Sequence, residues 1–365
     1  MMTVTEAESY DRAKEVQQFE ESKIGVNGIT TIPRFFIHPP DALSAIRRSK
    51  LNTKPDPDII PIIDFSGADS EQLRPTIVEK IPRAPREIGF FQVGNHGIGA
   101  DVLERVIGAV KGFQELPPAV KAQFYDYLRD RSRGVSFSNV DIFHSTAASW
   151  RDTLVMRRGP TLPELDEFPE IRRREALEWS QHGKQLGELL MGLLCEGLGL
   201  ATGRMKEMTF IDGRMMIGNY YPYCPQPDLT VGIPFHTDPG ALAILLQDHH
   251  GGLQCKCGDD WVDVKPVPGA LVVDIGDVFQ ILSNDEYKSM DHRALANSSR
   301  EARVSAVVFF APSDRDRFPC PTRQFAMPNR LLGPFPELIS PEKPARFRQF
   351  TRADYINRFY TKQLD

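Results

Sequence analysis

Short apolar runs dominate the chain after Gly213, and turn residues separate them at roughly ten-residue spacing. Runs of this length and spacing are typical of a β-sandwich or a small β-barrel. The pattern therefore predicts strands at residues 215–221, 242–246, 252–255, 261–264, 271–275, 287–290 and 304–310.

The chain before Gly213 follows a helical pattern instead. Apolar side chains recur near a 3.6-residue period in residues 169–200, which predicts one long core helix or a broken pair. A helix predicted at residues 70–88 contains Pro82 and Pro85, which should kink or end it. The remaining expected elements are strands at 59–65 and 89–93 and helices at 13–23, 100–113, 117–124 and 351–364.

These patterns divide the chain into four parts. We expect an N-terminal extension at residues 1–57 and a mainly helical region at 58–211. A β core at 212–320 and a C-terminal segment with a closing helix at 321–365 should follow. A β core flanked by helices, with a helical N-terminal region, is an α+β fold.

Composition and charge exclude several classes of protein. The 365 residues carry a net charge of −5 without a strongly basic region, so the electrostatic footprint of a nucleic-acid-binding protein is missing. The longest apolar stretch, 186–200, is broken by Glu188 and Glu196, and it predicts no membrane span. The polar, acidic residues 1–10 do not resemble a signal peptide.

The cysteines indicate a reducing compartment. There are five, their spacing is irregular, and no CxxC motif occurs. This usage indicates reduced structural thiols in a cytosolic protein, so we expect a cytoplasmic location. We also expect a monomer, because no strongly apolar surface stripe stands out in the sequence.

Pairs of polar residues two positions apart mark the β half as the place of the chemistry. Residues i and i+2 of a strand point to the same face. Polar side chains aimed into a small barrel are costly unless they are paired or bind something, so such pairs predict a ligand cavity. The pairs are His236 with Asp238, Asn219 with Tyr221, and Arg303 with Ser305.

His236 and Asp238 suggest two ligands of a metal site. Two histidines and one carboxylate suit non-haem Fe(II), because this set leaves positions open for substrate and oxygen. His292 remains as the third ligand, at the end of a possible strand, once histidines in turns and in the helical half are set aside. Structural histidines with ordinary partners are the main alternative. The histidines set aside are His38, His96, His144, His182, His249 and His250.

Arg303 and Ser305 suggest an anion site. Arginine presents a rigid fork that suits a carboxylate, and a nearby hydroxyl adds a donor. Tyr221 would add another hydroxyl. An internal salt bridge of Arg303 is the alternative that the sequence leaves open.

With these residues in view, the chain resembles the plant-type 2-oxoglutarate- and Fe(II)-dependent dioxygenases. The resemblance covers residues 58 to 311 in the order of that family. Its motifs are IPIID at 60–64, GFFQVGNHG at 89–97, NYYPYCP at 219–225, HTD at 236–238, LLQD at 245–248, GGLQ at 251–254, PGALVVDIGD at 268–277, His292-Arg and Arg303-Val-Ser305.

The N-terminal part resembles one branch of that family. GVNG at 25–28, IPRFF at 32–36 and HPP at 38–40 are similar to the homologues of aminocyclopropane-carboxylate oxidase. That branch includes benzoxazinoid-glucoside and alkaloid hydroxylases and demethylases of specialised metabolism.

The resemblance implies a double-stranded β-helix (jelly-roll) core, with Fe(II) held by His236, Asp238 and His292. It implies 2-oxoglutarate as co-substrate with O2, ascorbate as reductant, and a small aromatic or alkaloid-like metabolite that is hydroxylated or O-demethylated. The distal carboxylate of 2-oxoglutarate would meet Arg303, Ser305 and Tyr221, with Asn219 beside the site. Candidate substrate contacts are Phe309, Phe143 and Phe137; plain core phenylalanines are the alternative for each.

The chain departs from the family in places. The segment between Gly28 and Ile32 is short, and Pro82 and Pro85 lie where a proline-free helix is usual. Positions that carry a lysine and a glutamate in flavonoid-oxidising relatives are Ile217 and Ala311, which argues against a flavonoid and suggests a less charged pocket.

Two other functions stay open at this point. An iron oxidase of the same fold that does not use 2-oxoglutarate would also carry Arg303 and Ser305. A catalytically inert ligand-binding homologue is the other alternative, although it would not need open coordination positions. A zinc hydrolase is disfavoured, because no general base is evident near the proposed ligands.

Overall fold

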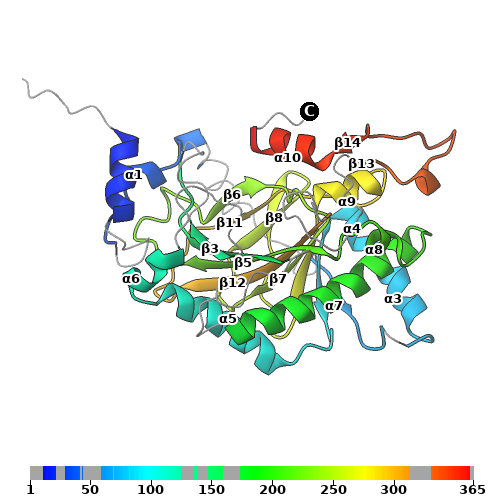
Figure 1. Ribbon diagram of the computed structural model, residues 1–365, viewed down its shortest axis with the longest axis horizontal. Helices are drawn as coiled ribbons and strands as arrows, with labels where there is room; N and C mark the ends of the chain where they lie inside the picture. Colours follow the sequence, from blue (N-terminus) through cyan, green and yellow to red (C-terminus); the bar gives the residue numbers. More distant parts are fainter. Residues whose placement is uncertain are drawn as a thin grey trace, which may run out of the picture.

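Two β-sheets form the core of the molecule, and helices cover the outer face of the larger sheet (Figure 1). The computed structural model describes residues 11–21, 29–41, 43, 59–68, 70–81, 83–124, 135–138, 147–158, 173–312 and 330–361. The arrangement is a jelly roll flanked by helices, so the predicted fold class is confirmed.

The larger sheet, within the described residues, has eight strands in the order β1-β2-β10-β7-β12-β5-β4-β3. Among its described strands, only β1 and β2 pair in parallel. Its strands are β1 (Ile62–Asp64), β2 (Phe90–Gly94), β3 (Val135–Ser138), β4 (Asp152–Arg158), β5 (Gly213–Tyr221), β7 (Leu242–Gln247), β10 (Leu271–Ile275) and β12 (Arg303–Ala311).

The smaller sheet has the order β6-β11-β8-β9, and a short third sheet pairs two strands near the C-terminus. The strands of the smaller sheet are β6 (Ile233–His236), β8 (Leu253–Cys257), β9 (Asp260–Asp263) and β11 (His292–Ala294). The third sheet consists of β13 (Leu331–Leu332) and β14 (Phe350–Thr351).

The described fold also contains α-helices and short 3-10 helices. Two of them, α5 (Ala100–Gln114) and α7 (Arg173–Gly197), run side by side along the larger sheet (Figure 1). The others are α1 (Arg12–Glu21), η1 (Arg34–Phe36), α3 (Arg74–Lys80), α4 (Arg83–Glu87), α6 (Pro118–Lys121), η2 (Ala122–Phe124), α8 (Arg204–Glu207), α9 (Asp277–Leu282), η6 (Pro336–Leu338) and α10 (Arg352–Thr361). No helix among them has the length and apolar character needed to cross a membrane.

Strand β12 separates the hydrophobic core from the polar face of the larger sheet. Its alternate side chains point to opposite faces. The odd-numbered set begins with Arg303 and Ser305, and Arg303 Nε donates to the Gly251 carbonyl just before β8 of the smaller sheet. The even-numbered set lies in the main core against the helices and consists of Val304, Ala306, Val308 and Phe310.

The two sheets also pack directly against each other. Phe90 and Val272 of the larger sheet share a buried cluster with Leu253, Cys255 and Val262 of the smaller one. This apolar contact holds the sheets together beside the polar residues that both sheets contribute.

Glycine allows helix α7 to lie close to β12. A Cβ atom at Gly187 would lie 2.2 Å from Cζ of Phe310, and one at Gly183 would lie 2.9 Å from Cγ2 of Val308. Phe310 is fully buried and cannot move aside. The close approach of helix and strand therefore requires the absence of a side chain at these positions.

The helix predicted at residues 70–88 is two helices in the structure. Pro75 occupies the first turn of α3, where its missing N–H costs nothing. Pro85 occupies the first turn of α4, and the break falls between Lys80 and Arg83. Pro82 itself lies outside the described residues. The expected interruption of the helix is therefore confirmed, although Pro85 lies within α4 and does not end a helix.

The pattern missed two strands in the predicted helical half. β4 pairs with β5 along its whole length, and β3 extends the same sheet. The strand predicted at 287–290 is wrong, because residue 287 lies in a bend and residues 288–290 have no regular structure. Tyr287 is fully buried there, and its hydroxyl donates to the Leu194 carbonyl at 2.9 Å. The strand begins at His292 instead.

Substitution at Gly187 tests the contact between α7 and β12. Gly187→Ala should lower the free energy of unfolding by about 1–3 kcal/mol, because the new methyl group overlaps the Phe310 ring. Gly108→Ala on α5 is the matched control, since a Cβ there meets no atom within 4 Å. The control should raise the free energy of unfolding by about 0.5–1 kcal/mol. Equal changes in the free energy of unfolding for the two variants, measured by urea unfolding, would contradict a close contact between Gly187 and Phe310.

Substitution at Glu196 tests the junction of α3 and α7. Arg74 Nη2 donates to Glu196 Oε1 at 2.7 Å, and this pairing holds the pKa of Glu196 below its usual 4.5. Glu196→Gln should lower the free energy of unfolding at pH 7 by about 1 kcal/mol. The difference should be full above pH 4.5 and vanish as the pH falls through the lowered pKa, because the native glutamate then loses its charge.

The control for this pair is Glu188→Gln on the same helix. Glu188 forms an ion pair with Lys206, but both side chains are exposed, so the substitution should have a smaller effect. A difference between Glu196→Gln and the unaltered protein that persists under acid would contradict the charge-based explanation.

Candidate active site

His236 and Asp238 lie at one end of the smaller sheet. His236 is the last residue of β6, and Asp238 follows in a loop rather than on the strand, contrary to the expectation of a shared strand. The loop is held by the backbone N–H of Asp277, which donates to the Asp238 carbonyl at 2.8 Å. The turn still brings His236 Nε2 within 3.8 Å of Asp238 Oδ1.

His292 completes the cluster, as the sequence predicted. It is the first residue of β11 and pairs in register with His236 on the neighbouring β6. The two imidazole rings lie 4.3 Å apart, and His292 Nε2 is 3.8 Å from the same Asp238 Oδ1. One ligand atom from each of the three residues lies within 4.8 Å of the others, so the group could hold a metal ion.

The protonation of the two histidines suits metal binding. Nδ1 of His236 lies 2.9 Å from the Pro234 carbonyl, and Nδ1 of His292 lies 3.3 Å from the Met290 carbonyl. A carbonyl can only accept, so each Nδ1 carries the hydrogen and each Nε2 keeps its lone pair. Burial lowers the pKa of both histidines to about 4, which keeps the rings neutral at pH 7.

Asp274 is a second carboxyl group beside this cluster, and the sequence analysis missed it. It lies on β10, with Oδ2 3.9 Å from His292 Nδ1. Burial and the neighbouring Asp238 raise the pKa of Asp274 well above its usual value. Burial also raises the pKa of Asp238. A divalent cation bound beside these carboxyl groups would favour their ionised forms. The available signal was an aspartate inside the apolar run 271–275.

Arg303 and Ser305 lie directly opposite Tyr221 and Asn219 on the neighbouring strand β5. Arg303 is buried, its Nη2 donates to Gln247 Oε1 at 3.2 Å, and its guanidinium lies 4.8 Å from the centre of the Tyr221 ring. These are neutral partners. Within the part of the chain that the structure describes, no carboxylate lies within ion-pair distance of Arg303.

Ser305 adds an unsatisfied donor to this row. Its side chain is 1% exposed, and Oγ makes no hydrogen bond with any described residue. A buried hydroxyl without a partner costs free energy unless a ligand satisfies it. Arg303 and Ser305 together therefore fit an anionic ligand such as a carboxylate.

Asn219 connects this row to the histidines through Arg151, which the sequence analysis did not single out. Asn219 Oδ1 accepts from Arg151 Nη1 at 3.0 Å and from Thr153 Oγ1 at 3.2 Å. The positive charge of Arg151 contributes to the lowered pKa of His236, so this guanidinium lies near the metal cluster. The polar face therefore carries a charge that the expectation of a less charged pocket did not include.

The three predicted substrate contacts fall in different places. Phe309 lies on β12, half-buried, on the same face as Arg303 and opposite Met215 of β5. Phe137 lies on β3, where its backbone pairs with Leu154. Phe143 lies outside the described residues. All three stay predictions.

Other residues considered as metal ligands have ordinary surroundings. His38 Nε2 lies 3.2 Å from the Ala148 carbonyl, and His96 Nε2 lies 2.9 Å from the Gly269 carbonyl. Ligand atoms of His249, His250 and Glu301 also lie within 4.8 Å of one another, but two of these side chains are exposed. The described cysteines are free thiols.

A jelly-roll core with two neutral histidines and one carboxylate defines the class of non-haem metal oxygenases. A model of the 2OG-Fe(II) oxygenase superfamily matches residues 213–312. A second model, described as the N-terminal region of a non-haem dioxygenase in morphine synthesis, matches residues 60–179. The chain belongs to the 2OG-Fe(II) oxygenase superfamily and is an oxidoreductase of that group, whose members use Fe(II), 2-oxoglutarate and O2.

Individual relatives agree with this assignment. The chain is 41% identical over 367 residues to 1-aminocyclopropane-1-carboxylate oxidase homolog 5 of Arabidopsis thaliana, covering 98% of this chain and 88% of the relative. It is 38% identical over 371 residues to deacetoxyvindoline 4-hydroxylase of Catharanthus roseus, covering 100% and 88%. The crystal structure of JOX2 in complex with 2OG, Fe and JA matches with a TM-score of 0.76 and 28% identity, over 96% of this chain and 94% of that one.

Proposed function

We propose that the protein hydroxylates or O-demethylates a small specialised metabolite and couples this to the oxidation of 2-oxoglutarate. The observation that carries the proposal is the metal cluster itself: the Nε2 atoms of His236 and His292 both face one oxygen of Asp238, while their Nδ1 atoms are held by carbonyls. We assign these three residues as the ligands of Fe(II). The set leaves metal positions for other ligands.

The chain supplies geometry and charge, and the bound groups supply the oxidising chemistry. Bound Fe(II) and 2-oxoglutarate provide a reaction in which O2 converts 2-oxoglutarate to succinate and CO2 while a substrate C–H bond becomes C–OH. The same reaction at an O-methyl carbon would release formaldehyde. His236 and His292 contribute neutral nitrogen ligands, and Asp238 contributes the negative charge that favours a divalent cation.

We assign Arg303, Ser305 and Tyr221 to the distal carboxylate of 2-oxoglutarate. Arg303 offers a buried guanidinium with neutral partners only, and Ser305 offers a hydroxyl without a partner. The Arg303 guanidinium lies over the Tyr221 ring, 4.8 Å from the ring centre. Asn219 lies next to Ser305 in register and would border the same ligand.

One relative and the aromatic residues support the substrate class that we propose. One relative is named for the hydroxylation of deacetoxyvindoline, which supports an aromatic or alkaloid-like substrate. We assign Phe309 as a ring on which such a molecule stacks, with Phe137 and Phe143 as further candidates. Ascorbate is the reductant that we expect to keep the iron in its ferrous form.

The first experiment measures succinate formed from 2-oxoglutarate in the presence of Fe(II), ascorbate and O2, during a mass-spectrometric screen of small metabolites. One metabolite should raise succinate and itself gain one oxygen atom or lose one methylene unit. Asp238→Ala should abolish both signals and iron binding, because it removes the only charged ligand of the triad. Iron binding without succinate under any condition would favour an oxidase that does not use 2-oxoglutarate.

The second experiment separates anion binding from structure at Arg303. Arg303→Ala should raise the KM for 2-oxoglutarate about tenfold or more, since a hydrogen bond to a charged group contributes about 1.5–3 kcal/mol. Arg300→Ala is the matched control, because Arg300 is exposed and stacks on Tyr223 near the start of the same strand. The control should leave the KM unchanged. An unchanged KM in Arg303→Ala would assign Arg303 to structure alone.

A further inference from the structure

The loop that carries the proposed iron ligands is bound twice by a single residue, Asp277. The backbone N–H of Asp277 donates to the Asp238 carbonyl at 2.8 Å. The Asp277 side chain accepts, at Oδ2, a hydrogen bond of 3.0 Å from Oγ1 of Thr237, which lies between the ligands His236 and Asp238. The orientation of the Asp277 carboxylate therefore bears directly on the loop.

The same carboxylate oxygen is held from the far end of the chain. The hydroxyl of Tyr355 on α10 donates to Asp277 Oδ2 at 2.5 Å. Tyr355 is 7% exposed, and its ring packs 5.3 Å from Phe350. Tyr355 is thus a buried residue whose ring serves the packing of the C-terminal segment, while its hydroxyl reaches toward the iron loop.

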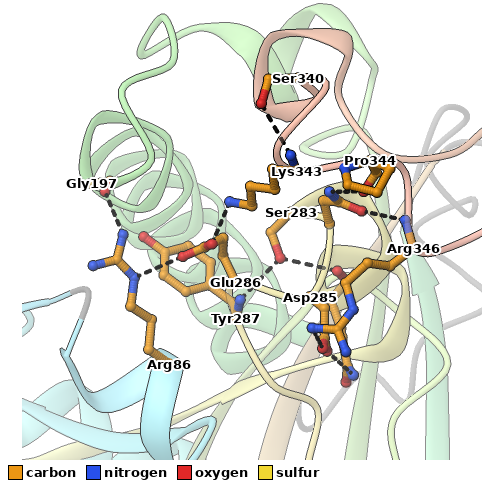
Figure 2. Close-up of polar contacts among 12 residues, drawn as sticks. Arg86, Gly197, Ser283, Asp285, Glu286, Tyr287, Ser340, Lys343, Pro344 and Arg346 are labelled. Carbon is orange, nitrogen blue, oxygen red and sulfur yellow. Dashed lines mark hydrogen bonds and ion pairs between the residues drawn. The ribbon is translucent and has the colours of Figure 1, made fainter.

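The segment that leads to α10 is itself anchored by charges. Glu286 forms ion pairs with Arg86 and Lys343, and Asp285 pairs with Arg346 Nη1 at 2.8 Å (Figure 2). These contacts fasten residues 343–346 to the chain that follows α9. The C-terminal segment therefore contacts both ends of α9. Ion pairs hold it to the residues just after the helix, and the Tyr355 hydroxyl binds Asp277, the first residue of the helix.

We propose that Tyr355 is a positioning residue of the iron site, which acts through Asp277 and Thr237 on the loop from His236 to Asp238. Each of the two donors restricts the Asp277 carboxylate. Without the Tyr355 hydroxyl, the carboxylate can turn away from Thr237, and the ligand loop gains freedom that metal binding must then remove. Outer hydrogen-bond partners of this kind orient the groups that ligate a metal. The inference rests on the proposed function, because it takes His236 and Asp238 as ligands.

The test uses the full chain and removes one oxygen atom. Tyr355→Phe keeps the ring and its packing but loses the hydroxyl. The affinities for Fe²⁺, and for Co²⁺ as a spectroscopic probe, should both fall by about tenfold. The visible absorption of bound Co²⁺ should also change, because it reports the geometry of the ligands. If the Tyr355 hydroxyl only stabilised the fold, this spectrum would stay the same.

Tyr287→Phe is the matched control. It removes another buried tyrosine hydroxyl, which donates to the Leu194 carbonyl and does not touch the loop. Its metal affinity and Co²⁺ spectrum should equal those of the unaltered protein. Asp277→Asn should weaken metal binding as Tyr355→Phe does, and the double variant should be no weaker than the single ones, because both act through one contact.

The outcomes distinguish the positioning role of Tyr355 from the proposed iron site itself. Metal affinity and spectrum that stay unchanged in Tyr355→Phe would overturn the positioning role and leave the proposed iron site standing. Equal losses in Tyr355→Phe and Tyr287→Phe would also overturn it, since the effect would then be general. Failure of the unaltered protein to bind either metal would overturn the proposed function, and the inference with it.

Discussion

The register of strand β12 is the constraint on which the rest of the structure depends. The strand pairs with β5 on one side and with β7 on the other, so its position sets both neighbours. A slip of one residue would turn Arg303 and Ser305 into the apolar core and bring Val304 to the polar face. Packing of the even-numbered side chains against the helices excludes that slip. The hydrophobic core therefore also positions the polar row.

Burial of charge is the second feature that unites the site. His236 and His292 are held neutral, and the carboxyl groups of Asp238 and Asp274 have raised pKa values. Such a group of side chains is poorly solvated by the protein alone. A bound divalent cation would offset the loss of solvation. The burial that disfavours ionised carboxylates without a metal therefore favours metal binding. On the larger sheet, the buried guanidinium of Arg303, whose partners among the described residues are neutral, favours an anion by the same argument.

The site is assembled from distant parts of the sequence. Arg151 comes from a region whose pattern predicted helices, and it reaches Asn219 because β4 pairs with β5. Tyr355 comes from the last helix of the described chain and reaches the loop through Asp277. Neither residue belongs to a motif with metal-ligand or carboxylate-binding spacing. Each takes its place through the path of the backbone around the core.

The sequence by itself determined the β character of the second half and the interruption of the early helix, and it named His236, Asp238 and His292 as candidate ligands. It could do so because apolar period, proline geometry and ligand type are local properties of the chain. Only the tertiary structure decided that β3 and β4 complete the larger sheet, that Asp238 lies in a loop, and that residues 287–290 form no strand. Those outcomes depend on the free edge of β5, where β4 and then β3 pair, and on contacts such as that of the Tyr287 hydroxyl with the Leu194 carbonyl. Such contacts join residues far apart in the chain, and no local pattern encodes them.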